Sequence, residues 1–133
     1  MDLVVFACVH NAGRSQMAAA LFNQRADPAR VRAISAGTNP GPHVHPEVVA
    51  AMAEVGIDLA HAIPQRLTPE LADGARALIT MGCGDQCPIV PGAMREDWPL
   101  PDPKGRPIAE VRAIRDDIAE RVGRLMAAHG WAR

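Results

Sequence analysis

The chain lacks the features that mark membrane proteins and nucleic-acid-binding proteins. It has no apolar stretch near the length of about 20 residues that a transmembrane helix requires. It has no basic run, and 15 Asp and Glu residues balance its 14 Lys and Arg residues, which leaves a net charge of −1. We therefore expect neither membrane insertion nor general nucleic-acid binding. The N-terminal segment also lacks a signal-peptide pattern, so we expect a cytoplasmic location.

Cysteine is scarce as well, with three residues in 133. An odd number without a secretory signal argues against a framework of structural disulfides and favours reactive or redox roles. The length fits one domain spanning residues 1–133, and the proportions of hydrophobic residues (48%) and charged residues (22%) are typical of a globular protein. We expect this domain to be a monomer.

Apolar segments of strand character alternate along the chain with segments of helical periodicity. Strands are expected at 3–7, 31–37, 77–81 and 95–100. Helices are expected from Ser15 to a point before Pro28, at 46–55, as a short helix after an N-cap at Thr68, and at 108–126. This alternation is typical of right-handed βαβ units. We therefore predict an α/β fold with a four-stranded, mostly parallel sheet and helices on both faces. Ligands of such sheets bind beyond the carboxyl ends of the strands.

The strongest chemical signal follows the first predicted strand. Cys8 ends this strand, Arg14 and Ser15 begin the next helix, and the loop between them consists of Val9, His10, Asn11, Ala12 and Gly13. Such a loop binds tetrahedral oxyanions, because unpaired N–H groups and the helix dipole both favour negative charge. The same field favours a thiolate over a thiol. A cysteine at a strand end can also be an inert buried thiol, but the strand–loop–helix setting favours a nucleophile.

The other two cysteines, Cys83 and Cys87, lie four residues apart in a glycine-containing loop after the third predicted strand. Three interpretations compete: a pair of buried thiols, a zinc site, and a redox pair that relays electrons by disulfide exchange. A zinc site needs four ligands, and no second Cys/His pair of matching spacing is present. Cys8 ends another strand, and the carboxyl ends of parallel strands share one edge of the sheet. A third thiol within reach favours the redox pair.

A carboxyl group for proton transfer is available late in the chain. Asp97 and Asp102 are both candidates for a general acid, a role worth about 10²–10⁴ in rate. Asp102 stands between two prolines, which limit its movement. An Asp before Pro is also a common turn former, and this alternative remains open.

Taken together, these residues resemble the low-molecular-weight tyrosine phosphatase superfamily. The resemblance rests on Cys8-x5-Arg14-Ser15, on Asp102-Pro103 and on the four-strand α/β layout. Within this superfamily, residues 8–18, 35–38, 80–88 and Asp97-Trp98 are similar to arsenate reductases of the thioredoxin-coupled type. The resemblance covers nearly the whole chain.

The resemblance implies that Cys8 attacks arsenate while Arg14 holds its oxygens and Asp102 protonates the leaving oxygen. It further implies that Cys83 attacks the Cys8–arsenic adduct, which releases arsenite, and that Cys87 resolves the resulting disulfide. The partner would be thioredoxin or a glutaredoxin-like thiol reductant, with no bound cofactor.

The chain departs from the family at two positions. The spacing from Cys83 to Cys87 is shorter than in members with a longer loop. Some members bind potassium through a Glu early in the first helix, where this chain has Ala19.

Two other functions remain open. A phosphatase would use the same loop, but it does not need Cys83 and Cys87, and phosphotyrosine binding tends to use tyrosines after Asp102-Pro103, where this chain has Lys104-Gly105. An anion or arsenite sensor would need an output surface, and the last predicted helix has mixed charge and no basic face for DNA.

Overall fold

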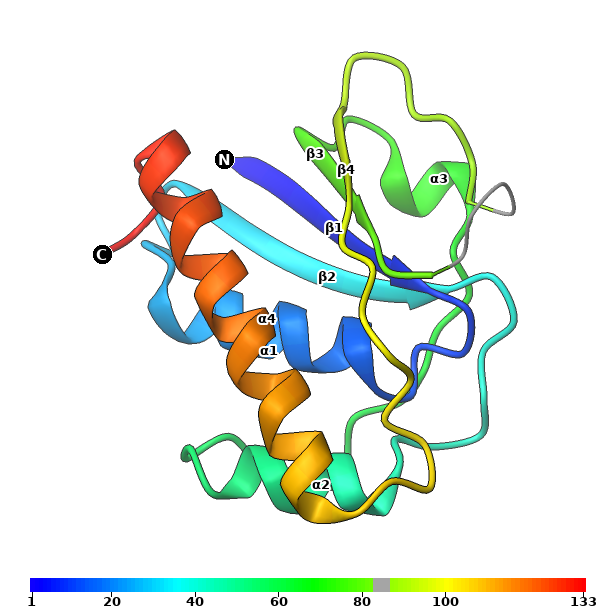
Figure 1. Cartoon of the computed structure of the whole chain (residues 1–133). Helices are drawn as coiled ribbons and strands as arrows, with labels where there is room; N and C mark the ends of the chain where they lie inside the picture. The colour runs from blue at the N-terminus through cyan, green and yellow to red at the C-terminus, as the bar shows by residue number, and fades with distance from the viewer. Residues whose placement is uncertain (83–86) are drawn as a thin grey trace.

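The computed structural model describes residues 1–82 and 87–133, and its path is drawn in Figure 1. The elements are, in chain order, β1 (Asp2–Cys8), α1 (Arg14–Arg25), β2 (Val31–Gly37), α2 (Pro46–Ala53), α3 (Pro69–Ala72), β3 (Ala77–Thr80), β4 (Met94–Asp97) and α4 (Ile108–His129). No helix among these described residues is both long enough and apolar enough to cross a membrane.

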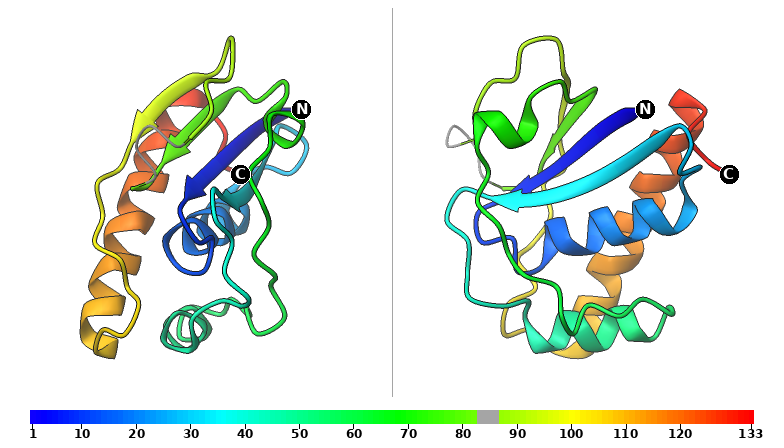
Figure 2. Two further views of the ribbon diagram at one scale, coloured as in Figure 1. Left: turned by 90° about the vertical axis from the view of Figure 1, so that its right-hand side faces the viewer. Right: turned by 180° about the vertical axis from the view of Figure 1, so that it is seen from behind.

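The four strands form one sheet in the order β2-β1-β3-β4, and every neighbouring pair is parallel. This confirms the predicted α/β fold. Because all strands run the same way, their carboxyl ends share one edge of the sheet (Figure 2). The central strand β1 is buried from Val4 to Cys8, which explains its continuous apolar run.

Helices lie on both faces of the sheet, but unequally. Figures 1 and 2 show α1, α2 and α4 on one face and the single-turn helix α3 on the other. The larger core cluster contains Phe6 of β1, Phe22 of α1, Met52 of α2 and Ile118 of α4. The smaller cluster joins alternate residues of β1, such as Val5, to α3 and the chain around it. Successive strand residues therefore point into two different cores.

The last strand is shifted from its predicted position. The sequence predicts a strand at 95–100, whereas β4 spans Met94–Asp97. The apolar residues Trp98 and Leu100 are buried in the larger core instead of continuing the strand. Pro99, between them, has no N–H group to donate to a neighbouring strand. The second predicted helix also ends earlier, at Ala53.

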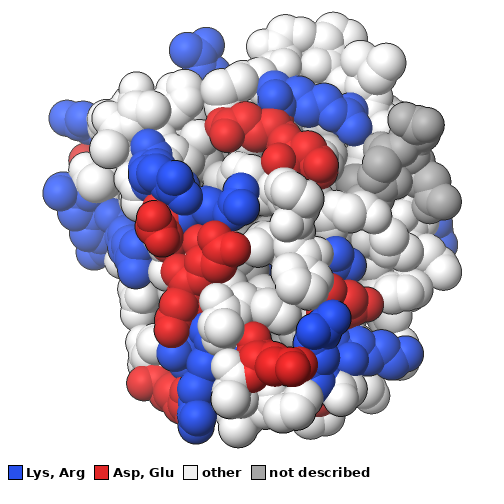
Figure 3. Space-filling model, in the orientation of Figure 1, with Lys and Arg blue, Asp and Glu red and all other residues white. Residues whose placement is uncertain are grey.

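Charged side chains of both signs are interspersed over the face shown in Figure 3. One ionic cluster joins α2 to α4. Glu54 accepts hydrogen bonds from Nε and Nη2 of Arg112 and from Nη1 of Arg115, at 2.7–3.1 Å. The Arg112 and Arg115 hydrogen bonds lower the pKa of Glu54 from its ordinary 4.5 to about 2. This carboxyl therefore remains ionised in the folded state at pH values where it is protonated in the unfolded chain.

We expect Glu54→Gln to make the protein less sensitive to acid. The contribution of an ionised Glu54 is fully present above about pH 4.5 and is lost as the pH falls from 4.5 towards 2. The variant should have a lower free energy of unfolding at pH 7 and a flatter decline between pH 4.5 and 2, measured by urea unfolding. Glu120→Gln is the matched control, because the Arg124–Glu120 pair is exposed and 3.7 Å apart. A Glu54→Gln profile with the wild-type slope would contradict this account.

Candidate functional site

The candidate site is the loop that joins the end of β1 to the start of α1. Cys8 is the last residue of β1 and only 2% exposed, and Arg14 is the first residue of α1. Gly13 occupies the N-cap position, and no side chain caps the helix. The N–H groups of the first turn are therefore available to an anion, as predicted.

Cys8 lies at the end of a chain of hydrogen bonds. Its Sγ lies 2.8 Å from Oγ of Ser15, which also accepts a hydrogen bond of 2.7 Å from Nδ2 of Asn11. While its oxygen accepts from Asn11, the hydroxyl of Ser15 keeps its one proton for donation to a sulfur anion at Cys8. Asn11 and Ser15 therefore connect the loop to the sulfur.

The amide of Asn11 is itself fixed from its oxygen side. Oδ1 accepts from Nε2 of Gln16 at 3.2 Å and from the backbone N–H of Gln65 at 3.0 Å. Because a backbone N–H can only donate, the oxygen of Asn11 must face Gln65 and its nitrogen must face Ser15. Asn11 is the only non-glycine residue with positive φ among those described, at 50°. The sequence analysis missed Gln16 and Gln65, although a Gln following Ser15 on a mostly apolar helix face was a usable signal for the first.

Arg14 and two glycines complete the surroundings of the loop. Nη1 of Arg14 donates to the backbone oxygen of Leu100 at 3.0 Å. A Cβ on Gly82 would lie 2.7 Å from Nη1 of Arg14, and a Cβ on Gly37 would lie 2.5 Å from the backbone oxygen of Val9. The end of β2 therefore presses against the backbone of the anion loop, where a side chain does not fit, and the chain after β3 presses against the end of the Arg14 side chain.

Asp102 lies near the loop but forms a local turn. It is exposed, its Oδ1 accepts from the backbone N–H of Lys104 at 3.0 Å, and the adjoining Pro103 lies where a Cβ on Gly13 would meet it at 2.8 Å. The hydrogen bond from Lys104 is that of a turn former, which is the alternative that the sequence left open. The packing of Pro103 against Gly13 nevertheless keeps Asp102 beside the loop. Its role as a general acid remains a prediction.

Asp97 is placed less favourably for proton transfer at Cys8. It accepts a hydrogen bond of 2.8 Å from Oγ1 of Thr80, and it ends β4, which is two strands away from β1. Two strand spacings amount to about 10 Å. Among the two candidates, the sheet order therefore favours Asp102.

Two histidines border the loop. Nδ1 of His10 lies 2.9 Å from the backbone oxygen of Asn39, so this nitrogen carries the proton. Burial lowers the pKa of His45, against the opposing effect of Glu47 and Asp102. His45 is therefore neutral at pH 7. These histidines line a hollow of about 390 Å³ beside Ala12 together with Pro40, Pro42 and Lys104.

The predicted redox pair, Cys83 and Cys87, belongs to the segment that follows β3. Cys83 lies outside the described residues. Met81 donates its N–H to the backbone oxygen of Ala7 at 2.7 Å, and Gly82 contacts Arg14, so the chain leaves β3 next to the anion loop. Cys87 is 5% exposed and belongs to the smaller core cluster. Among the described residues there is no group of three or more potential metal ligands.

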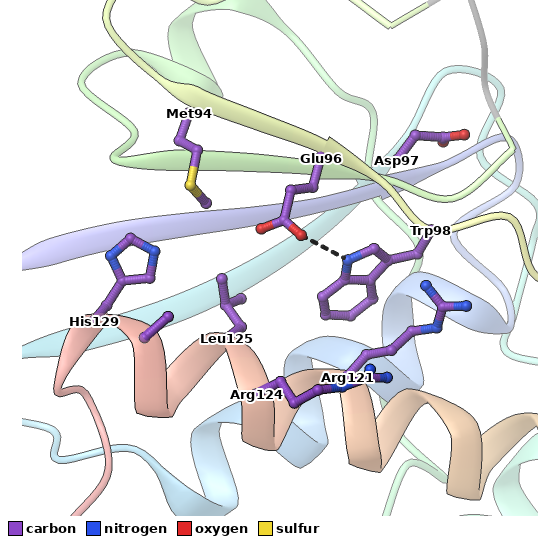
Figure 4. A pocket seen from close by; sticks show the side chains of 9 residues that line it. Met94, Glu96, Asp97, Trp98, Arg121, Arg124, Leu125 and His129 are labelled. Carbon is purple, nitrogen blue, oxygen red and sulfur yellow. Dashed lines mark hydrogen bonds between the residues drawn. The ribbon is translucent and has the colours of Figure 1, made fainter.

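A second hollow lies away from the anion loop. It has a volume of about 410 Å³ and lies between β4 and the C-terminal half of α4. Figure 4 shows Glu96 and Asp97 on the strand, opposite Arg121, Arg124 and His129 on the helix. None of residues 8–15 lines it, so it is not an extension of the candidate site.

Comparison with known proteins gives one consistent picture. The family model for low molecular weight phosphotyrosine protein phosphatases matches residues 3–130. A putative arsenate reductase of Halobacterium salinarum (strain NRC-1) is 40% identical over 122 residues, which cover 88% of this chain and 85% of that protein. A glutaredoxin arsenate reductase of Synechocystis sp. is 35% identical over 130 residues, which cover 96% of this chain and 98% of that protein.

A solved structure supports the same relationship. The thioredoxin-dependent arsenate reductase of Corynebacterium glutamicum superposes with a TM-score of 0.83 at 38% identity. The match covers 96% of this chain but 61% of that protein, so this chain spans about three fifths of the longer structure.

We expect Gly37→Ala to weaken anion binding by about tenfold or more, because a Cβ 2.5 Å from the backbone oxygen of Val9 must displace the loop. The measurement is the phosphate concentration that halves the rate of Cys8 alkylation by iodoacetamide. Gly41→Ala is the matched control, because its Cβ would lie 3.8 Å from the nearest atoms of the same loop. Equal protection of both variants would show that the loop tolerates displacement at Gly37.

Proposed function

The chain belongs to the low molecular weight phosphotyrosine protein phosphatase family, and from this membership we propose that it is an arsenate reductase that converts arsenate to arsenite. The observation that carries the proposal is the 2.8 Å contact between Oγ of Ser15 and the buried sulfur of Cys8, at the base of an uncapped helix N-terminus. This arrangement places a nucleophile and an anion site together.

The reaction begins when the thiolate of Cys8 attacks arsenic. An S–As bond forms, and one arsenate oxygen leaves as water after protonation, with Asp102 as the proposed acid. Arg14 and the N–H groups of the loop neutralise the charge of the remaining oxygens. Arg14 is already held within reach of the loop by its hydrogen bond to Leu100.

Electron transfer follows through sulfur. In the proposed step, the thiolate of Cys83 attacks Sγ of Cys8, an S–S bond forms, and the electron pair of the broken S–As bond reduces arsenic from As(V) to As(III). Cys87 then attacks Cys83 and releases the thiolate of Cys8. The position of Gly82 against Arg14 supports this relay, because it brings the start of this segment to the anion loop.

The two electrons must be restored from outside. We propose that a thioredoxin-like or glutaredoxin-like dithiol protein reduces the Cys83–Cys87 disulfide, and that the enzyme acts as a cytoplasmic monomer without a bound cofactor. The names of the similar proteins, glutaredoxin arsenate reductase and thioredoxin-dependent arsenate reductase, support both kinds of reductant equally.

Phosphomonoester hydrolysis is the second candidate function. The family membership supports it, and the same loop would bind phosphate, which has nearly the shape and charge of arsenate. A hydrolase has no use for two further thiols, however, so Cys83 and Cys87 favour reduction as the main activity. Weak hydrolysis of small phosphoesters is compatible with both.

We expect Cys8→Ser to abolish arsenate turnover, because an alcohol oxygen cannot form the S–As bond or enter a disulfide. The measurement is arsenate-dependent NADPH oxidation with thioredoxin and its reductase, repeated with a glutaredoxin system. Hydrolysis of para-nitrophenyl phosphate should be lost in parallel. Arsenate turnover by Cys8→Ser at more than a few per cent of the wild-type rate would exclude Cys8 as the nucleophile.

We expect the other two cysteines to separate reduction from hydrolysis. Cys87→Ser should release about one arsenite per chain and then stop, since the Cys8–Cys83 disulfide cannot be resolved. Cys83→Ser should release none. Both variants should keep the wild-type rate of para-nitrophenyl phosphate hydrolysis, which also serves as the control for correct folding. Sustained arsenate turnover by either variant would exclude the three-cysteine relay.

A further inference from the structure

The amide oxygen of Asn11 already uses its full hydrogen-bonding capacity. A carbonyl oxygen has two lone pairs, and Oδ1 of Asn11 accepts from Nε2 of Gln16 at 3.2 Å and from the backbone N–H of Gln65 at 3.0 Å. Asn11 is fully buried and Gln16 is 8% exposed, so water does not substitute for these donors. No lone pair of this oxygen remains for a cation.

A second oxygen in the same region is also bonded to an amide. Nε2 of Gln65 donates to the backbone oxygen of Ser35 at 2.9 Å. The same residue accepts from the backbone N–H of Gly37 and so ties this segment to the end of β2. Gln65 therefore contacts both Asn11 and the turn that presses on the loop.

A metal ion needs several oxygen ligands with free lone pairs. The helix position that carries a Glu in potassium-binding family members is Ala19, which has no oxygen in its side chain. The polar residues that line the hollow containing Ala19 include Gln16, Ser35 and Gln65, and no carboxylate among the described residues lines it. The two glutamines direct N–H groups at the oxygens of Asn11 and of the Ser35 backbone. The residues present therefore do not fit a bound cation.

We propose that Gln16 and Gln65 are positioning residues that hold Asn11, and through it Ser15 and Cys8, in the anion-binding conformation without any monovalent cation. The two amides stabilise the backbone of Asn11 at φ 50° and keep its Nδ2 directed at Ser15. The inference rests on the proposed function only in that Cys8 reacts at an oxyanion site, and its test does not require arsenate reduction.

The first measurement is the cation dependence of the wild-type protein. The probes are the pH profile of Cys8 alkylation by iodoacetamide and the phosphate concentration that halves its rate. Cys83→Ala/Cys87→Ala protein is used so that one thiol reports. Both quantities should be unchanged when potassium is replaced by tetramethylammonium at constant ionic strength. A change of more than about twofold in either would overturn the proposal.

The second measurement removes the amide donors. Gln16→Met keeps the length of the side chain but leaves the buried oxygen of Asn11 with one donor instead of two. We expect phosphate protection to weaken by about tenfold and the alkylation profile to change, because Asn11 is no longer held by both donors. Gln65→Met keeps the backbone N–H bond to Asn11 but loses the hydrogen bond to Ser35 that positions this backbone, so a smaller change in the same direction is expected. Gln65 is exposed, so its variant is the one to rely on if Gln16→Met does not fold.

Asn23→Ala is the matched control. Asn23 lies on the same helix, and its amide exchanges two hydrogen bonds of 2.9 Å with the backbone of Ala33 in β2, away from the anion loop. It should lower the melting temperature without changing the pH profile or the phosphate protection. If both Gln variants behave like Asn23→Ala, the amides only stabilise the fold and the proposal is wrong. Failure of arsenate turnover in a protein that passes these tests would count against the proposed function alone.

Discussion

The site depends on a chain of hydrogen bonds that runs from Gln65 through Asn11 and Ser15 to Cys8. The backbone N–H of Gln65, 54 positions further along the chain than Asn11, can only donate, so the amide oxygen of Asn11 faces Gln65 and its nitrogen faces Ser15. Oγ of Ser15 then lies 2.8 Å from the sulfur of Cys8. Each bond in such a chain polarises the next. The orientation of the group next to the nucleophile is thereby set by a residue distant in sequence.

The parallel sheet explains how this arrangement is built. The anion loop follows the central strand, so the chains that leave both neighbouring strands emerge beside it. Gly37 and Gly82 are the residues at these two contacts: a side chain at Gly37 would collide with the backbone of Val9, and Gly82 lies against the guanidinium of Arg14. The base of the loop is held by apolar cores on both faces of β1. Packing below and close contacts at the sides therefore restrict the conformation of the loop.

The sequence predicts those features of the fold and of the site that depend on hydrophobic periodicity and on residues close in the chain. The α/β order, the four strands and the anion loop follow from patterns that are local in the chain. The predicted end of β4 lies too far along the chain because the apolar residues Trp98 and Leu100 resemble a strand, while their side chains fill the helix-side core. The roles of Gln65 and Gly37 depend on contacts distant in sequence, and a single Gln or Gly carries no signal of such a contact.

Reduction and hydrolysis, as proposed, would use the same loop, so the choice between them would be made after the anion has bound. In both, Cys8 would form a covalent adduct, and the outcome would depend on whether water or a second sulfur attacks it. Water must reach the adduct from the side of Asp102, which is exposed, whereas a thiol must come from the chain that leaves β3 at Gly82. Reduction is therefore favoured by a high local concentration of thiol, which a covalently attached cysteine supplies without a change in the loop. The pairing of β1 with β3 brings the chain that leaves β3 at Gly82 next to the anion loop of residues 8–15.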